Sequence, residues 1–357
     1  AGRRAAPLLR LWLHRPARAE TGGLVQTVIQ RTEPAGDFRT LAYQVRDAGL
    51  LDRRLGHYWT KIVVTVAAFG AGWAALFALG GSWWVLAVAA FLGVASCQLG
   101  FLGHDAGHGQ VFAARRANRL LGLVIGNGLV GLSFGWWVAK HSAHHAHPNQ
   151  PDLDPDIGLG LVGTRSPEDA GDGHGLAGWL ARWQAELFFP LMLLRSTGLY
   201  LSGGLDLLRR RDRAALAESL LVVAHAALYL AVIFWALPPP EAVAFILVHQ
   251  AVFSVYLGCS FAPNHKGMPI IEDGSAMGFA QRQVVTARNV SGGRCTGFVL
   301  GGLNYQIEHH LFPTMPRPNL ARAQDLVRAF CRENRLAYCE ERPIASYRRA
   351  VWRPGVA

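Results

Sequence analysis

Histidine is the residue type whose number and spacing in this chain point most directly to chemistry. The sequence holds 14 histidines, and eight of them fall in four short segments. His104 and His108 form HDAGH, His141, His144 and His145 form HSAHH, His265 follows Asn264, and His309 and His310 close QIEHH. Spacings of three and four residues place imidazoles on one face of a helix. A random HxxHH pattern is expected only about 0.02 times in such a chain, so the pattern predicts a metal site.

The use of histidine as the ligand type does not determine which metal is bound. Neutral imidazole suits iron, zinc, copper and nickel alike. Eight imidazoles exceed the three or four that one metal ion takes from protein, so their number favours more than one ion. The sequence has neither the Glu-x-x-His pairs of soluble di-iron bundles nor the His-Glu-x-x-His helix of zinc proteases. A Ser-His-Asp hydrolase would not need so many histidines.

The composition is unlike that of an ordinary soluble protein. Of 357 residues, 51% are hydrophobic and 17% are charged, whereas soluble domains carry about 25% charged residues. The mean hydropathy is +0.19. Five cysteines without a Cys-x-x-Cys pair argue against thiolate zinc sites and redox dithiols. The net charge of +11 in so apolar a chain favours membrane lipid headgroups as the partner and argues against nucleic acid.

Four apolar stretches are long enough to cross a bilayer, which takes about 20 residues for ~30 Å of hydrocarbon. They cover residues 62–79, 83–103, 214–237 and 242–262, and short turns join them in pairs. The turns contain no Lys or Arg, whereas basic residues flank the other ends, so we expect both termini to be cytosolic. The sequence therefore predicts an all-α integral membrane protein: four transmembrane helices in two hairpins and a cytosolic helical cap that holds a histidine-rich dimetal site.

The expected order along the chain follows from these spans. It comprises a cytosolic basic lead-in (1–61), a first hairpin (62–103), a cytosolic or interfacial segment (104–213), a second hairpin (214–262) and a cytosolic segment (263–357), together one functional domain. The stretch Asp37–Leu51 has amphipathic helical spacing and is expected to lie on a surface. A further apolar run, Leu120–Val138, is interrupted by Asn127 and five glycines. As a fifth span it would separate His104 from His141, so we expect a re-entrant or interfacial helix.

The histidine segments and their neighbours carry a resemblance to a known family. HDAGH, HSAHH with the following His147-Pro148-Asn149 and Asp154-Pro155-Asp156, and QIEHH with the following Leu311-Phe312-Pro313 resemble the membrane fatty-acid desaturases. The Gln at the start of the third segment is typical of the front-end and acyl-lipid type, and other segments resemble a bacterial acyl desaturase branch. The resemblance implies a non-haem centre of two iron ions held by histidine, O2 as co-substrate, and insertion of a cis double bond into an acyl chain.

Residue by residue, the resemblance implies that all eight clustered histidines are metal ligands. Gln306 stands where other members have a further histidine, and whether it binds iron or orients a neighbour stays open. Asp105, Asp154 and Asp156 are candidates to fix imidazole tautomers by hydrogen bonding, and Asn264 belongs to the same supporting set. The paired Trp136 and Trp137 are candidates for interfacial anchors or for walls of an acyl tunnel. His225 and His249 lie inside spans and are candidates for a mutual hydrogen bond or for tunnel lining.

Partners follow from the same resemblance. The substrate would be an acyl-CoA, an acyl chain on acyl carrier protein, or an acyl lipid. The chain contains no His-Pro-Gly-Gly haem motif, so no haem is expected and electrons would come from a separate ferredoxin, cytochrome b5-like protein or flavin reductase. The excess of Arg over Lys, with abundant Ala and Gly, favours a bacterial source and hence a bacterial cytoplasmic membrane. The basic residues that flank the spans place the expected active site on the cytosolic side.

Two other functions are open at this point. A related hydroxylase, ketolase or acetylene-forming enzyme uses the same histidine set. A metal transporter would also span the membrane, but it would need ionisable ligands along a path through several spans, whereas here they gather at one end.

Overall fold

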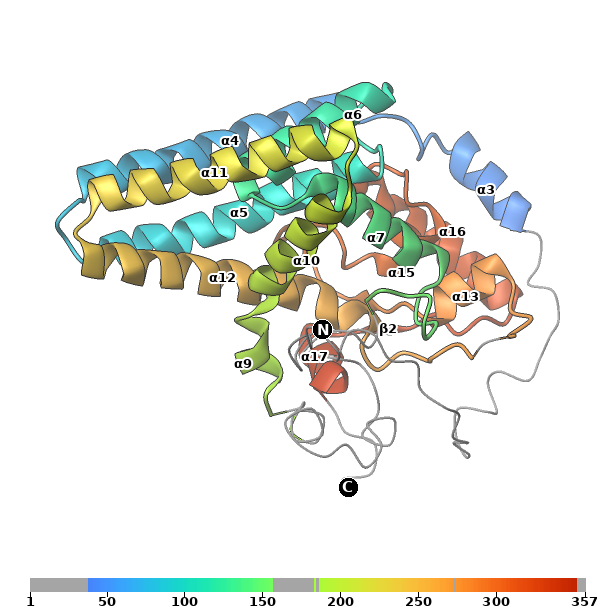
Figure 1. Ribbon diagram of the computed structural model, residues 1–357. Coiled ribbons are helices and arrows are strands. Elements are labelled where there is room, and N and C mark those ends of the chain that lie inside the picture. Colours follow the sequence, from blue (N-terminus) through green and yellow to red (C-terminus); the bar gives the residue numbers. More distant parts are fainter. Residues whose placement is uncertain (1–37, 157–182, 184–185, 273, 352–357) are drawn as a thin grey trace, which may run out of the picture.

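The computed structural model describes residues 38–156, 183, 186–272 and 274–351, and this part of the chain is almost entirely helical (Figure 1). Four long apolar helices form an elongated bundle: α4 (Leu55–Ala78), α5 (Val85–Gly107), α11 (Arg213–Ala236) and α12 (Pro239–His265). Each is long and apolar enough to cross a membrane. The prediction of an all-α protein with four candidate spans in two hairpins is therefore confirmed.

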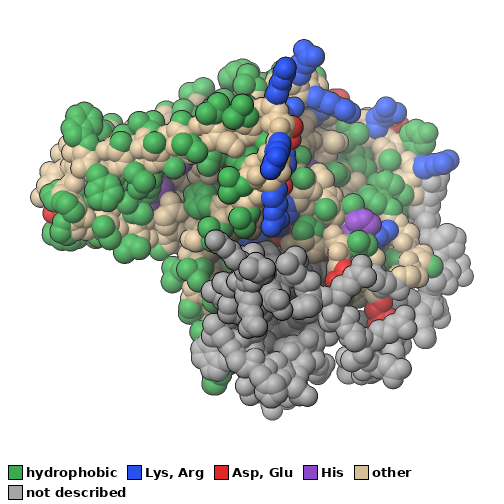
Figure 2. Space-filling view, in the orientation of Figure 1, with side chains coloured by type: hydrophobic (Ala, Val, Ile, Leu, Met, Phe, Trp, Pro, Cys, Tyr) green, Lys and Arg blue, Asp and Glu red, His purple; other side chains and the backbone are tan. Residues whose placement is uncertain are grey.

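The bundle is built around α5 and α12, while α4 and α11 expose most of their surface. Buried side chains run along most of α5, whereas α11 has three buried residues among 24. At Gly93 the backbone of α12 comes so close that a Cβ would lie 2.9 Å from the carbonyl oxygen of His249. Exposed hydrophobic side chains cover the bundle in Figure 2, as a lipid-facing surface requires.

The interrupted apolar run folds into a sharply bent unit. Helix α6 (Arg115–Leu123) continues into a π-helical segment, η1 (Val124–Val130), and then turns by 113° into α7 (Phe134–Ala146). Gly131 ends η1 with a left-handed φ of 81°, a conformation that glycine adopts without strain. The Asn127 side-chain oxygen accepts a hydrogen bond from the backbone N–H of Phe134 across the turn. The bend returns the chain to the level where it left α5, as expected for a re-entrant segment.

Two helices cross the ends of the spans. They are α9 (Phe188–Met192) and α10 (Arg195–Arg209), which run across the bundle axis in Figure 1. Near this level, Figure 2 shows a column of Lys and Arg side chains between the apolar bundle and the rest of the molecule. An apolar bundle with a basic belt at its end is the charge pattern expected at an anionic membrane surface.

The remaining elements form a cap beyond the belt. They are α3 (Phe38–Asp47), α13 (Phe279–Val285), α14 (Arg294–Val299), α15 (Gln306–Leu311), α16 (Arg317–Glu333) and α17 (Pro343–Val351), with β1 (Asn289–Val290) paired in parallel to β2 (Glu340–Glu341). The amphipathic stretch expected on a surface is α3, and its apolar face packs into the cap through Leu41 and Val45. The cap thus has its own apolar core beneath α15.

Candidate metal centre

The eight clustered histidines come from four helices that meet where the bundle joins the cap. His104 and His108 lie at the end of α5, and His265 is the last residue of α12. His141, His144 and His145 lie on α7, and His309 and His310 lie on the six-residue α15. The bend between η1 and α7 brings the ring of His141 to 4.9 Å from that of His104, so the two segments do lie at one end of the spans.

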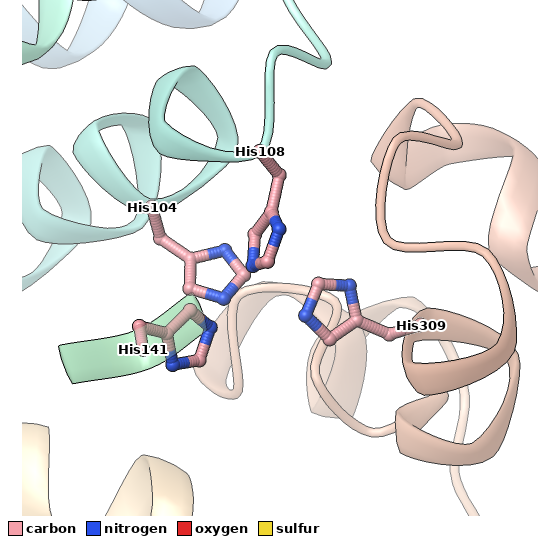
Figure 3. A group of neighbouring side chains, drawn as sticks. All are labelled: His104, His108, His141 and His309. Atoms are coloured by element: carbon pink, nitrogen blue, oxygen red, sulfur yellow. The ribbon is translucent and has the colours of Figure 1, made fainter. Parts of the chain in front are cut away.

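The imidazoles separate into two groups. The first histidine group contains His104, His108, His141 and His309, whose rings face one another in Figure 3. The second histidine group contains His144, His265 and His310. In each group, one ring nitrogen per residue lies within 4.8 Å of the others. Four and three converging nitrogens match the number of protein ligands that a transition-metal ion takes.

His145 lies between the two groups. Its Nε2 atom is 3.1 Å from Nε2 of His141 in the first group. Its ring stacks on that of His310 in the second group, with 4.2 Å between the ring centroids. One imidazole is therefore placed to complete either group.

The unsatisfied nitrogens test whether these residues fit a metal. The Nε2 atoms of His104, His108, His309 and His310 and Nδ1 of His145 are buried without a hydrogen-bond partner. Leaving such groups unpaired is costly unless a ligand occupies them. Burial, followed by the neighbouring imidazoles, holds the pKa of His108, His141, His145, His309 and His310 well below the ordinary value. The rings are therefore neutral, with lone pairs free, as metal ligands must be.

Hydrogen bonds on the opposite nitrogens fix the ring orientations. In the second group, Nδ1 of His144 is 3.0 Å from both carboxylate oxygens of Asp154. Nδ1 of His265 donates to the carbonyl oxygen of Thr286, and Nδ1 of His310 is 2.8 Å from Oε1 of Gln283. Each contact leaves Nε2 directed into the site, the arrangement that orients histidine ligands in metalloproteins. The supporting role of Asp154 was predicted from the sequence, whereas no sequence pattern indicated that Gln283 or Thr286 would orient a histidine.

The other two predicted carboxylates have different partners. Asp105 Oδ1 lies 3.4 Å from Nδ1 of His104, and its other oxygen pairs with Arg317, a residue that the sequence gave no reason to select. Asp156 forms ion pairs with Lys140 and with Arg195, and its oxygen lies 3.8 Å from Nδ1 of His144. The lysine is the main reason that the pKa of Asp156 is held below its ordinary range, against the effect of burial.

A cavity of ≈ 190 Å³ adjoins the imidazoles. His104, His141, His144 and His265 line one part of it, and Val130, Leu199, Phe253 and Leu257 line an apolar part. Trp137 lines the cavity and stacks on His141, with 4.7 Å between the ring centroids. Along α12 the lining runs from His265 to Phe253, twelve residues or about 18 Å of helix. That length is close to the hydrocarbon thickness of one leaflet, about half of ~30 Å.

The remaining tunnel candidates lie elsewhere among the described residues. Trp136, His225 and His249 are not part of the cavity lining. Nδ1 of His225 is 2.9 Å from the carbonyl oxygen of Gly128 in the re-entrant segment. His249 lies between Ser96 Oγ and Tyr229 Oη, at 3.2 Å and 2.8 Å. The hydrogen-bond partners of His225 and His249 therefore lie on η1, α5 and α11, and the two histidines are not hydrogen-bonded to each other.

A family model described as fatty acid desaturase matches residues 81–342, which include all eight clustered histidines. The chain belongs to the fatty acid desaturase family. The assignment confirms the resemblance predicted from the histidine segments, and the family and the two histidine groups together indicate a metal centre. The family is membrane-bound, in agreement with the four candidate spans.

Relatives among known proteins carry desaturase names. The Acyl-lipid (9-3)-desaturase of Physcomitrium patens is 33% identical over 326 residues, which are 87% of this chain and 61% of the relative. The Delta(8)-fatty-acid desaturase of Helianthus annuus is 29% identical, over 87% of this chain and 70% of the relative. The Delta(5) fatty acid desaturase fat-4 of Caenorhabditis elegans is 33% identical, over 84% and 69%. The chain thus spans about 61–70% of the length of these relatives.

Gln306 faces the second histidine group. Its Nε2 atom lies 2.9 Å from Nε2 of His265, and its Oε1 accepts a hydrogen bond from Asn264 Nδ2 at 3.1 Å. Asn264 and Gln306 are both buried, and Oδ1 of Asn264 has no hydrogen-bond partner. The amide thus occupies the position beside His265 from which it can orient that ring or present an oxygen to the site.

A proline break near the end of α12 sets the position of His265. Pro263 has no N–H to donate to the carbonyl of Cys259, and Tyr347 Oη of α17 donates to that carbonyl at 2.7 Å. The carbonyl of Pro263 itself accepts hydrogen bonds from Ser346 Oγ and from the Arg288 side chain, which is fully buried. The C-terminal helix therefore provides hydrogen bonds to the backbone carbonyls of the helical turn that ends in His265.

One buried carboxylate holds the bent segment η1–α7 against α11. Glu218 lies near the start of α11 and is 2% exposed. Its Oε2 accepts hydrogen bonds from Ser133 Oγ at 3.0 Å and from the backbone N–H of Gly135 at 2.9 Å. Nδ2 of Asn127 lies 3.4 Å from the same oxygen. Because Ser133 caps α7, this carboxylate fixes the start of the helix that carries three of the histidines.

Proposed function

We propose that the protein is an O2-dependent fatty acyl desaturase that introduces a cis double bond into an acyl chain. The observation that carries the proposal is the pairing of two histidine groups, with unsatisfied buried nitrogens, and an apolar cavity one leaflet in length. Membership of the desaturase family supports the same reaction class.

Two iron ions are the proposed metals, one in each histidine group, with His145 completing the set. Imidazole ligands suit iron, and the number of converging nitrogens fits two ions. When bound there, the ions would supply the activation of O2 and the removal of one hydrogen from each of two adjacent carbons. Asp105, Asp154, Thr286 and Gln283 would fix the imidazole tautomers through Nδ1 and leave Nε2 aimed at the ions.

The protein's own contribution is to position the chain and exclude water. The cavity is lined by Trp137, one helical turn before His141, and by Phe261 and Leu257, one and two turns before His265. An acyl chain in the cavity would therefore be held by apolar side chains next to the metals. Restricting a flexible chain to one pose can supply a large part of the rate enhancement. A pair of methylene groups would react in the part of the cavity that is lined by the four histidines.

Electrons would come from a separate protein, either a ferredoxin, a cytochrome b5-like protein or a flavin reductase. We place the cap and both termini in the cytosol of a bacterium, with the spans in its inner membrane, because basic residues gather at the cap end of the bundle. A membrane-impermeant thiol reagent applied to whole cells should then label Gly81→Cys and Glu241→Cys but not Arg322→Cys on α16. Labelling of Arg322→Cys from outside would reverse the proposed orientation.

The test of the function is lipid profiling of a bacterial host that expresses the wild type or His309→Ala. The wild type should yield fatty acids two mass units lighter than their saturated precursors, with one new double bond, and the variant should yield none. A product sixteen units heavier would identify a hydroxylase instead. The absence of any new product, with the protein folded, metal-loaded and supplied with an electron donor, would contradict the proposal.

A further inference from the structure

The cavity follows one face of two neighbouring spans and ends inside the bundle. On α12 its lining residues recur at every fourth position, at Phe253, Leu257, Phe261 and His265. On α5 the lining residue farthest from the cap is Gly100. A Cβ there would meet nothing within 4 Å outside the backbone of its own helix, so the cavity is open at this position. The next positions on the same two faces, one turn farther from the cap, are Ser96 on α5 and His249 on α12.

A hydrogen-bonded contact joins these two positions. Nε2 of His249 lies 3.2 Å from Oγ of Ser96, and Nδ1 of His249 lies 2.8 Å from Oη of Tyr229 on α11. His249 and Ser96 are both buried. Since both ring nitrogens have partners, the imidazole cannot turn without losing a hydrogen bond. Three spans are thus joined one helical turn beyond the deepest lining residues, and we call Ser96, Tyr229 and His249 the polar floor.

The helices are tightly packed at the level of the polar floor. A Cβ on Gly93 would lie 2.9 Å from the carbonyl oxygen of His249, so α5 and α12 approach each other through their backbones. Leu92 and Phe245, one turn farther from the cap on the same two helices, are fully buried in the apolar core. Within the part of the chain that the structure describes, the cavity lining on α12 ends at Phe253. The polar floor therefore lies between the cavity and a filled core.

Polar groups at this position resist a hydrocarbon chain that is too long for the cavity. Each methylene that leaves water strengthens binding at most about fourfold. A chain that reached into the polar floor would separate at least one of its hydrogen bonds. A buried polar group that is left without its partner weakens binding roughly 5- to 150-fold. One added methylene therefore does not offset the loss of one hydrogen bond of the polar floor.

On the basis of the proposed function, we infer that the polar floor sets the longest hydrocarbon segment that the protein accepts beyond its histidine groups. The ligand class is an unbranched hydrocarbon end, because Val130, Leu199 and Leu257 make this part of the cavity apolar. Along α12 the floor lies sixteen residues from His265, or about 24 Å of helix. This depth is fixed by hydrogen bonds among three spans, so Ser96, Tyr229 and His249 determine specificity without contacting the metal site.

Binding of saturated fatty acids to the purified full-length protein tests the inference without turnover. The probes are radiolabelled free acids with even carbon numbers from twelve to twenty-two, each in the same detergent micelles. Comparison of a variant with the wild type for one probe at a time cancels the partition of that probe into the micelle. The longest chain that binds should differ between variants that deepen the cavity and variants that shorten it.

The double variant His249→Ala/Tyr229→Phe deepens the cavity. It removes two members of the polar floor, and the remaining hydroxyl of Ser96 can bond a carbonyl of its own helix. We expect it to bind the longest probes at least about tenfold tighter than the wild type does, and the shortest probes equally. Gly100→Val places a side chain in the open part of the cavity and should weaken the binding of all but the shortest probes about tenfold.

Tyr256→Phe is the matched control. Its hydroxyl also joins α12 to α5, since it accepts a hydrogen bond from Nε2 of Gln98 at 2.7 Å, but neither residue lines the cavity. It should bind every probe as the wild type does. Tyr229→Phe, which keeps the ring and loses one hydrogen bond of the polar floor, should bind the longest probes about threefold tighter and serves if the double variant does not fold. An equal gain in Tyr256→Phe, or no gain in the folded polar-floor variants, would overturn the inference.

The result is separable from that of the proposed function, because fatty acid binding needs neither O2 nor an electron donor. An unchanged length limit in variants that still make unsaturated products would remove the polar floor as a determinant of specificity and leave desaturation standing. A shifted length limit in a protein that makes no product would contradict the function and support the polar floor.

Discussion

Nη2 of Arg317 lies 2.6 Å from Oδ2 of Asp105, and this ion pair joins the start of α16 to the end of α5. Both side chains are at most 10% exposed. The same guanidinium donates to the carbonyl of Phe101, one turn before His104. The two histidine segments most distant in the sequence, HDAGH and QIEHH, are therefore held together by side chains that belong to neither histidine group.

We expect Arg317→Met to destabilise the protein by about 3–5 kcal/mol, because it leaves the Asp105 carboxylate buried without its partner. The double variant Asp105→Asn/Arg317→Met should recover part of that loss, since no unpaired charge remains. Thermal unfolding in detergent measures both effects, with Arg322→Met on the exposed side of α16 as the control. A double variant less stable than Arg317→Met would show that the charge pair is not the cause.

Gln306→Ala tests whether the amide binds metal or orients His265. If Gln306 only supports the ring, the variant should keep two irons per chain and lose about 10–100-fold in activity, the usual effect of removing a ligand's hydrogen-bond partner. His310→Ala should lose iron and turnover together, and Gln306→His should retain measurable activity. Iron content and product yield for the three variants decide the matter. Loss of iron from Gln306→Ala as complete as that from His310→Ala would make Gln306 a ligand.

Tyr347→Phe removes the donor that satisfies the carbonyl freed by Pro263. We expect a loss of about 1–3 kcal/mol in stability and up to about tenfold weaker binding of the metal held with His265, while the first histidine group keeps its ion. Metal titration into the stripped protein resolves the two affinities. Tyr43→Phe, whose phenol is on the exposed face of α3, is the control and should change neither. An equal fall in both affinities would point to general unfolding.

Glu218→Ala should leave Ser133 Oγ and the N–H of Gly135 without an acceptor and loosen the start of α7. We expect activity to fall about 10–100-fold with the loss of metal, whereas Glu218→Gln, which keeps one acceptor oxygen, should lose less. Glu241→Gln, in the first helical turn of α12 at the far end of the spans, serves as the control. Hydrogen exchange of α7 checks the cause, and unchanged protection in Glu218→Ala would exclude it.

The metal-free protein should lose stability below pH 6.5. Five buried histidines have a pKa well below the ordinary value of about 6.5, so they stay neutral in the folded state while the unfolded chain takes up protons. Each can cost up to about 1.4 kcal/mol per pH unit as the pH falls from 6.5 towards its folded pKa, and nothing above 6.5. Unfolding midpoints between pH 8 and pH 5 measure this. A midpoint that is flat across that range would contradict the burial of neutral rings.

The sequence was sufficient for the features that depend on local pattern. Apolar length predicted the four spans, and helical spacing predicted that the histidines would share faces. Both signals are carried by residues close together in the chain, where periodicity and hydropathy act. The re-entrant segment within Leu120–Val138 was expected for a different reason, because a fifth span would separate His104 from His141, and the bend brings their rings to 4.9 Å.

The supporting contacts could not be predicted in this way. Arg317 meets Asp105, and Tyr347 meets Cys259, across long stretches of sequence that have no shared period. His225 and His249 were placed at similar depth by their spans, but helix rotation decides a side chain's partners, and it directs them to Gly128 and to Ser96 and Tyr229. The rotation of an apolar helix about its own axis does not change its hydropathy, so it cannot be predicted from the hydropathy pattern.

The order of the clustered histidines along the chain also affects how the site is assembled during synthesis. His104, His108 and His141 leave the ribosome well before His309, and at 5–20 residues per second the interval is on the order of 10–40 s. During that time three imidazoles of the first group can already meet in the membrane-inserted chain, in a set that suits zinc as well as iron. Growth medium rich in zinc should therefore yield protein whose first histidine group holds zinc in place of the proposed iron, bound before His309 is synthesised.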